Sequence, residues 1–175
     1  VSAAQSSIQD WNGLGAKGRA DLLERAAQIM VDERELSIAI MARDSGKTVS
    51  EAEPEISEGI DFARFYALSA LPKEEGSNPA GVVLVVPPWN FPYAIPIGGI
   101  CAALSSGNTV ILKPAPETVA TAWHFINQFW RAGIPKSVLH FLPTRDDKIG
   151  KQLVSHDGVD AVILTGAFDT ASLFM

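Results

Sequence analysis

One amide side chain, Asn90, stands between two aromatic residues just after a short apolar run. The run, residues 82–86, holds five consecutive apolar residues, four of them β-branched, as in a strand buried on both faces of a parallel sheet. Pro87 and Pro88 should end this strand, because proline cannot donate to the sheet ladder. An amide at the carboxyl end of a buried strand can donate hydrogen bonds to a ligand or to a developing oxyanion. The alternative is that Asn90 caps the helix that follows.

Similar apolar runs recur through the second half of the chain. After Gly81, short apolar runs alternate with helical patterns, which is typical of a parallel doubly wound sheet. The expected strands, all of them buried, are 82–86, 109–112, 138–142 and 161–164, and the expected helices between them are 93–105, 117–131 and 146–154. A final helix is expected to start near Asp169.

The carboxyl ends of these strands should meet at one edge of the sheet, because right-handed crossovers give all parallel strands the same direction. We therefore expect one edge to gather residues 88–90, 113–117, 143–146 and 165–167. A nucleotide should lie at that edge.

The first part of the chain has the periodicity of helices. Residues 17–43 predict two helices with a break at Asp32-Glu33, and the second should bury a face made of Leu36, Ala39 and Ile40. A further helix is expected over 51–71, with Ser50 as its N-cap, and a linker over 71–79.

The segment before these helices, residues 1–16, is polar, and Trp11 and Leu14 are its expected anchors onto the rest of the protein. Residues 13–18 contain the Gly-x-Gly-x-x-Gly pattern of dinucleotide-binding loops, but no strand precedes it. A loop that leads into a helix is the better interpretation. Ser45-Gly46-Lys47-Thr48 lacks the first glycine of a phosphate-binding loop.

These patterns predict an α/β protein with two parts. Residues 1–78 should form an N-terminal helical segment, and residues 79–175 a Rossmann-like, doubly wound sheet that binds a nucleotide. The composition, 47% hydrophobic and 19% charged with a net charge of −6, is typical of a soluble globular protein. The negative charge argues against a nucleic-acid surface.

The remaining reactive side chains do not predict a site of their own. Cys101 is the single cysteine, which fits a reducing, cytoplasmic compartment, and its apolar neighbours favour an inert core thiol. No metal site is expected, because ligand spacing is absent among His124, His140 and His156. Residues 82–104 carry no charge, but their four prolines argue against a membrane span. The N-terminus has no signal-peptide pattern.

Three ordered motifs resemble the aldehyde dehydrogenase superfamily. They are Pro88-Trp89-Asn90-Phe91-Pro92, the run from Gly107 to Pro114, and Leu164-Thr165-Gly166. Residues 19–23 and 45–48 match as well. Residues 55–67 most resemble the glutamate-semialdehyde (pyrroline-5-carboxylate) dehydrogenase module of the bifunctional proline utilization A family.

This resemblance implies that residues 79–175 are the first part of a Rossmann-like NAD(P)-binding domain, and it also implies the chemistry. The cofactor would be NAD, with NADP as the alternative, and the substrate a small aldehyde, L-glutamate γ-semialdehyde, which is oxidised to glutamate in proline catabolism. A homo-oligomer is implied, and a fusion to a proline dehydrogenase domain is left open.

The resemblance also implies roles for individual residues. The Asn90 amide would donate to the oxyanion that forms when a cysteine thiolate attacks the aldehyde. Lys113 matches a lysine that hydrogen-bonds the adenosine ribose, with a solvated strand-end cation as the alternative. Trp89 would line the cofactor pocket, with core packing as the alternative. The other cofactor-binding positions implied are Pro88, Pro114, Glu117, and Gly166 and Ala167, whose backbone would meet the pyrophosphate at a helix start.

Several positions depart from the family pattern. Pro116 stands where many members have a ribose-binding glutamate, with Glu117 one place later, and Ala167 replaces a serine. Asp146 sits where a glycine often lets the backbone approach the cofactor, and an acid there would repel the pyrophosphate. These departures argue against tight NAD binding by this chain.

The family's catalytic cysteine and glutamate would fall after Met175. We therefore expect this chain to be the N-terminal part of an enzyme and to be inactive by itself. Two alternatives stay open, another aldehyde or semialdehyde dehydrogenase and a non-catalytic nucleotide-binding module.

Overall fold

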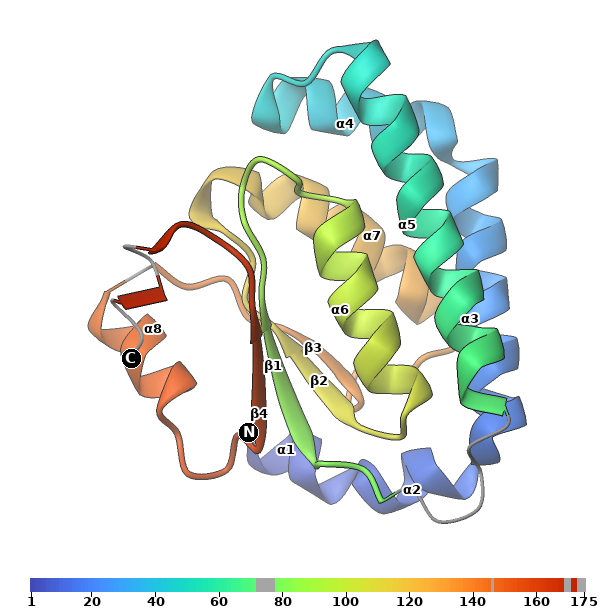
Figure 1. Cartoon of the computed structure of the whole chain (residues 1–175), viewed down its shortest axis with the longest axis vertical. Coiled ribbons are helices and arrows are strands. Elements are labelled where there is room, and N and C mark those ends of the chain that lie inside the picture. The colour runs from blue at the N-terminus through green and yellow to red at the C-terminus, as the bar shows by residue number, and fades with distance from the viewer. Residues whose placement is uncertain (72–77, 146, 169–170, 173–175) are drawn as a thin grey trace.

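Helices form the first part of the chain, and a parallel sheet with its crossover helices forms the rest (Figure 1). The structure, a computed structural model, describes residues 1–71, 78–145, 147–168 and 171–172. The helices are α1 (Ser2–Ser6), α2 (Ile8–Gly13), α3 (Gly15–Asp32), α4 (Arg34–Ser45), α5 (Val49–Ala70), α6 (Ala94–Ser105), η2 (Pro116–Thr118), α7 (Val119–Arg131) and α8 (Lys148–Val154). The strands are β1 (Val82–Val86), β2 (Thr109–Leu112), β3 (Leu139–Phe141) and β4 (Ala161–Leu164).

The strands form one parallel sheet in the order β3-β2-β1-β4. This arrangement confirms the predicted α/β class with helices followed by a parallel sheet. Chain order runs outward from β1 through β2 to β3, and β4 then returns to the other side of β1. The strand order therefore reverses at β1, which is where ligands bind in doubly wound sheets.

The expectation that all these strands are buried is wrong for the edges of the sheet. β1 and β2 are buried along their whole length, whereas β3 is only partly buried. In β4, Val162 is 39% exposed. Within the described part of the chain β4 pairs on one side only, with β1, so less of its surface is covered.

The two faces of β1 pack into two separate apolar clusters. Val83 and Val85 join the larger cluster, which also contains side chains of α3, α5, α6 and α7. Val82, Leu84 and Val86 join a smaller one with Ala4 and Leu153, from α1 and α8. Figure 1 shows α6 and α5 on one side of the sheet and α8 on the other.

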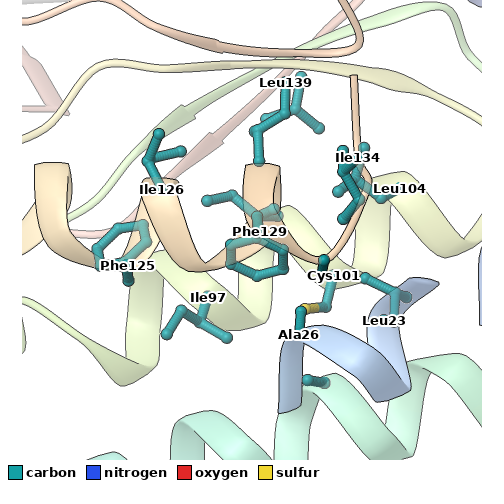
Figure 2. Close-up of a cluster of buried hydrophobic side chains, with 14 of the residues drawn as sticks. Leu23, Ala26, Ile97, Cys101, Leu104, Phe125, Ile126, Phe129, Ile134 and Leu139 are labelled. Carbon is teal, nitrogen blue, oxygen red and sulfur yellow. The ribbon is translucent and has the colours of Figure 1, made fainter. Parts of the chain in front are cut away.

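Small residues let α6 approach its neighbours closely. A Cβ added at Gly99 would lie 3.1 Å from Cγ1 of Val85 in the sheet, and one at Gly98 would lie 3.1 Å from Cδ2 of Phe62 in α5. Figure 2 shows Cys101 of α6 within the same cluster, beside Phe129 and Ala26. Helices from both predicted parts thus share one core, and the division at residues 78 and 79 stays a prediction.

The N-terminal segment is more ordered than the sequence predicted. Residues 1–16 contain α1, α2 and the start of α3, where a polar segment and a loop were expected. Trp11 is buried and its Nε1 donates to the carbonyl oxygen of Leu104 at 3.0 Å, as an anchor should. Leu14 lies at the junction between α2 and α3 and its side chain is exposed, so the prediction that it is an anchor is wrong.

Two details of α4 and α5 also correct the sequence-based prediction. The buried positions of α4 are Ser37 and Met41, and Leu36 is exposed. The N-cap of α5 is Thr48 rather than Ser50, because Glu51 lies three residues after Thr48 and completes a capping box with it.

Three further expectations lie wholly or partly outside the described residues. They concern the linker over 71–79, the position of Asp146 and the final helix near Asp169. No helix among the described residues is both long and apolar enough to cross a membrane.

Candidate functional site

A cavity of about 690 Å³ opens at the carboxyl ends of β1, β2 and β4. Its floor is held by backbone hydrogen bonds that continue the sheet past the strand ends. The N–H of Lys113 donates to the carbonyl of Val85 at 2.9 Å, and the N–H of Thr165 donates to the carbonyl of Val86 at 3.1 Å. The cavity therefore lies at the carboxyl edge of the sheet, where the strand order reverses.

Most of the predicted site residues line this one cavity, although they come from three separate segments. They are Pro88, Trp89 and Asn90 after β1, Lys113 and Glu117 after β2, and Gly166 and Ala167 after β4. Pro114 is buried and does not line the cavity. None of residues 143–145 lines it either, because β3 is the outer neighbour of β2 and its end lies away from β1.

Lys113 is buried although it carries a charge. It is only 1% exposed, so the alternative of a solvated cation at the strand end is wrong. Lysines are rarely buried this deeply unless they interact with other groups. A positive charge set into the cavity wall suits a polar or anionic ligand.

Asn90 does not cap the helix that follows. The first amides of α6 are occupied by the carboxylate of Glu55, whose Oε1 accepts from the N–H of Tyr93 at 2.8 Å and of Ala94 at 3.2 Å. Asn90 is exposed to the cavity, and α6 has no side-chain cap of its own. The amide of Asn90 is therefore available to a ligand.

A second cavity of about 560 Å³ lies on the other side of the loop over 87–92 and shares Trp89, Asn90 and Phe91 with the first. The turn between α4 and α5 forms its other wall, with Lys47 and Glu55 among its lining residues. The loop thus separates two spaces, and Asn90 borders both.

Lys47 and Glu55 also belong to this site, although they are not among the residues predicted for it. Nζ of Lys47 lies 2.5 Å from Oε2 of Glu55 and 4.3 Å from the centroid of the Phe91 ring. The sequence does carry one signal, because Lys47 belongs to Ser45-Gly46-Lys47-Thr48, which resembles an incomplete phosphate-binding loop. The pairing itself is tertiary and could not be inferred from spacing.

The remaining nucleophile and the histidines lie apart from both cavities. Burial raises the pKa of the Cys101 thiol, which is the opposite of what a nucleophile needs. Burial also lowers the pKa of His124, whose Nε2 is hydrogen-bonded with Oγ of Ser37 at 2.9 Å. Among the residues described, no group of three or more His, Cys, Asp and Glu side chains could hold a metal ion.

Comparison with known proteins gives one family over the whole chain. Residues 1–175 match the family model described as the aldehyde dehydrogenase family. The 1-pyrroline-5-carboxylate dehydrogenase of Staphylococcus epidermidis is 36% identical over 184 residues, covering 97% of this chain and 36% of the relative. The bifunctional protein PutA of Escherichia coli is 37% identical over 175 residues, covering 99% of this chain and 13% of the relative.

The chain is also similar to a solved structure of a 1-pyrroline-5-carboxylate dehydrogenase. A mutant of Thermus thermophilus 1-pyrroline-5-carboxylate dehydrogenase superposes with a TM-score of 0.94 at 30% identity, covering 99% of this chain and 37% of that one. The chain spans about a third of the length of the dehydrogenases that it matches.

Proposed function

Because the chain belongs to the aldehyde dehydrogenase family, we propose that it supplies the oxyanion donor and part of the NAD site of an L-glutamate γ-semialdehyde dehydrogenase. The observation that carries this proposal is that Asn90 and Lys113 line a single cavity at the point where the strand order reverses. The catalytic cysteine and glutamate of the family would come from residues outside these 175, so the chain alone should not oxidise aldehydes.

The cavity suits a dinucleotide in size and in the groups that it presents. Its volume lies within the range of small-molecule sites, and Lys113 could hydrogen-bond ribose hydroxyls. Gly166 and Ala167 line the cavity directly after β4, so their backbone could meet the pyrophosphate. NAD, when bound, would accept a hydride from the substrate, and NADP is the alternative.

Glu117 is exposed at the rim of this cavity, on the short helix η2. A carboxylate there could accept hydrogen bonds from ribose hydroxyls. Trp89 and Phe91 would shield the reacting groups from water, since both rings border the cavity.

The chemical role of this chain centres on Asn90. Attack on the aldehyde carbon places a negative charge on the carbonyl oxygen, and a fixed amide donor stabilises that charge more than it stabilises the neutral aldehyde. Asn90 borders both cavities, so its amide can reach an aldehyde on one side of the loop while the cofactor occupies the other.

The substrate is proposed from the relatives. Two of them are named 1-pyrroline-5-carboxylate dehydrogenase, and the open-chain form of that cyclic imine is glutamate γ-semialdehyde. The match to the bifunctional protein PutA supports a place in proline catabolism and a fusion to proline dehydrogenase as one possible arrangement. A cytoplasmic homo-oligomer fits the same proposal.

The test uses the full-length protein that contains this chain. We expect NADH formation with glutamate semialdehyde and NAD, and much slower turnover with acetaldehyde or succinic semialdehyde. Preference for another aldehyde would show a different member of the family. NAD binding without turnover of any aldehyde would favour the non-catalytic nucleotide-binding module.

A further inference from the structure

Two charged residues of the helical segment, Lys47 and Glu55, form an ion pair beside the loop that carries Asn90. Nζ of Lys47, in the turn between α4 and α5, lies 2.5 Å from Oε2 of Glu55 on α5. The Glu55 side chain is 1% exposed and that of Lys47 is 13% exposed. A charge this deeply buried is costly unless it is paired and hydrogen-bonded.

Glu55 uses its other oxygen to fix the end of the loop. Oε1 accepts from the N–H groups of Tyr93 and Ala94 at 2.8 and 3.2 Å. These amides begin α6, where the helix dipole favours a negative charge. One carboxylate therefore joins the start of α6 to Lys47.

Lys47 holds the same loop at a second point. Its ammonium lies 4.3 Å from the centroid of the ring of Phe91, the residue that follows Asn90 in the chain. This is within the distance of a cation–π interaction. The neighbouring rings cannot fix the loop by burial alone, since Trp89 is 56% exposed and Phe91 is 43% exposed.

We propose that Lys47 and Glu55 are positioning residues that hold the Asn90 amide in the orientation for oxyanion stabilisation. The proposal rests on the proposed function of Asn90. Lys47 contacts the loop at Phe91 and Glu55 contacts it at Tyr93, one on each side of Pro92. Because Lys47 and Glu55 are themselves an ion pair, the two contacts depend on each other. Loss of the Lys47 ammonium removes the cation–π contact with the Phe91 ring. It also leaves Glu55 as an unpaired buried charge, which weakens its hold on the first amides of α6.

The test is a double-mutant cycle in the full-length enzyme with Lys47→Gln and Asn90→Ala. We expect Lys47→Gln to lower kcat by roughly tenfold to a hundredfold, since small misplacements of catalytic groups cost this much. The KM for NAD should stay unchanged. In the Asn90→Ala background, Lys47→Gln should have almost no further effect, because a positioning residue acts only through its target. Multiplicative losses, or an unchanged kcat in Lys47→Gln alone, would overturn the proposal.

A matched control uses an ion pair between α4 and α5. Nη1 of Arg34 lies 2.7 Å from Oε1 of Glu53, and neither residue lines the two cavities. Arg34→Gln should leave kcat unchanged although it also removes an interhelical ion pair. Lys47→Arg, which keeps a cation able to stack on a ring, should recover most of the activity that Lys47→Gln loses.

Crystal structures of the variants separate this proposal from the proposed function. We expect Asn90 to be displaced in Lys47→Gln and in place in Arg34→Gln, whatever aldehyde the enzyme uses. If the wild-type enzyme oxidised no aldehyde but the loop moved in this way, only the proposed function would fail. If Lys47→Gln did not fold, Glu55→Gln would replace it in the same cycle, because the glutamine oxygen can still accept from the amides of Tyr93 and Ala94. An unchanged position of Asn90 in the crystal structure of the variant used would overturn the proposal.

Discussion

The hydroxyl of Tyr93 donates a hydrogen bond of 2.8 Å to Oε1 of Gln128, and both side chains are fully buried. The Tyr93 ring meets Phe125 edge to face, with 5.8 Å between the ring centroids. A Cβ at Gly59 would lie 3.1 Å from Cδ1 of Tyr93. Burial raises the pKa of the Tyr93 hydroxyl, which therefore stays a neutral donor. Tyr93 thus ties the end of the site loop to both α5 and α7.

The first prediction concerns this bond. Tyr93→Phe should lower the free energy of unfolding by about 1–3 kcal/mol, because Oε1 of Gln128 would be left buried without its donor. The measurement is urea denaturation of the variant and the wild type. Tyr66→Phe is the control, since Tyr66 packs on Phe62 and Phe65 and its hydroxyl has no hydrogen bond among the residues described. If both substitutions lowered the free energy of unfolding by the same amount, the Tyr93–Gln128 hydrogen bond would not be stabilising.

The second prediction concerns the reactivity of Cys101. The thiol is fully buried and its pKa is raised by burial, so iodoacetamide should label it only after unfolding. Labelling should be slow in buffer and fast in denaturant, as measured by mass spectrometry of the peptide that contains Cys101. Rapid labelling of this peptide in the native protein would show that the core opens there.

The third prediction is a pH dependence of stability. Arg131 donates to Glu33 through two nitrogens, at 2.7 and 2.6 Å, and this pair lowers the pKa of the Glu33 carboxyl below its ordinary 4.5. A lowered folded-state pKa gives stability that is present above pH 4.5 and is lost as the pH falls through the folded value. Arg131 is half exposed, so the pair is worth up to about 1 kcal/mol.

Unfolding of Glu33→Gln and wild type at several pH values tests this. The wild type should be the more stable at pH 7, and the difference should shrink as the pH falls below 4.5. Glu24→Gln is the control, because Glu24 meets Arg64 through a single, longer contact of 3.2 Å. A difference that stayed constant down to strongly acid pH would contradict the role of the Glu33 charge.

The strands and the site edge could be predicted because local patterns determine them. The apolar runs of β1, β2 and β4 are bounded by glycine, proline or polar residues, and their predicted limits match the structure. Once the strands are parallel, the gathering of Asn90 and Lys113 at one edge follows from handedness alone.

What could not be predicted depends on contacts between distant segments. Glu55 lies well before α6 in the chain, yet it caps that helix in place of Asn90. In α4 apolar residues occur on more than one face, and packing against α5 and α7 decides that Met41 and Ser37 are the buried ones. The burial of Lys113 likewise results from the segments around the strand end, which its sequence neighbours do not reveal.

The fourth prediction tests Lys113 as a cofactor ligand. Lys113→Met keeps the apolar stem of the side chain and removes the charge, so the Kd for NAD in the full-length enzyme should rise roughly tenfold or more, as for the loss of one charged hydrogen bond. Isothermal titration calorimetry measures this directly. Lys136→Met is the control, because Lys136 lies over the Trp130 ring and does not line the cavity. An identical Kd for Lys113→Met and wild type would remove Lys113 from the cofactor site.

The last prediction separates a catalytic from a structural role for Asn90. Asn90→Ala should lower kcat by on the order of a hundredfold or more, as loss of one oxyanion donor does in other enzymes. Asn90→Asp should lower it at least as much, because a carboxylate cannot donate and repels the developing charge. Neither variant should lose stability, since Glu55 and not Asn90 caps α6. Steady-state kinetics with thermal denaturation of each variant gives both results, and full activity of Asn90→Ala would reject the oxyanion role.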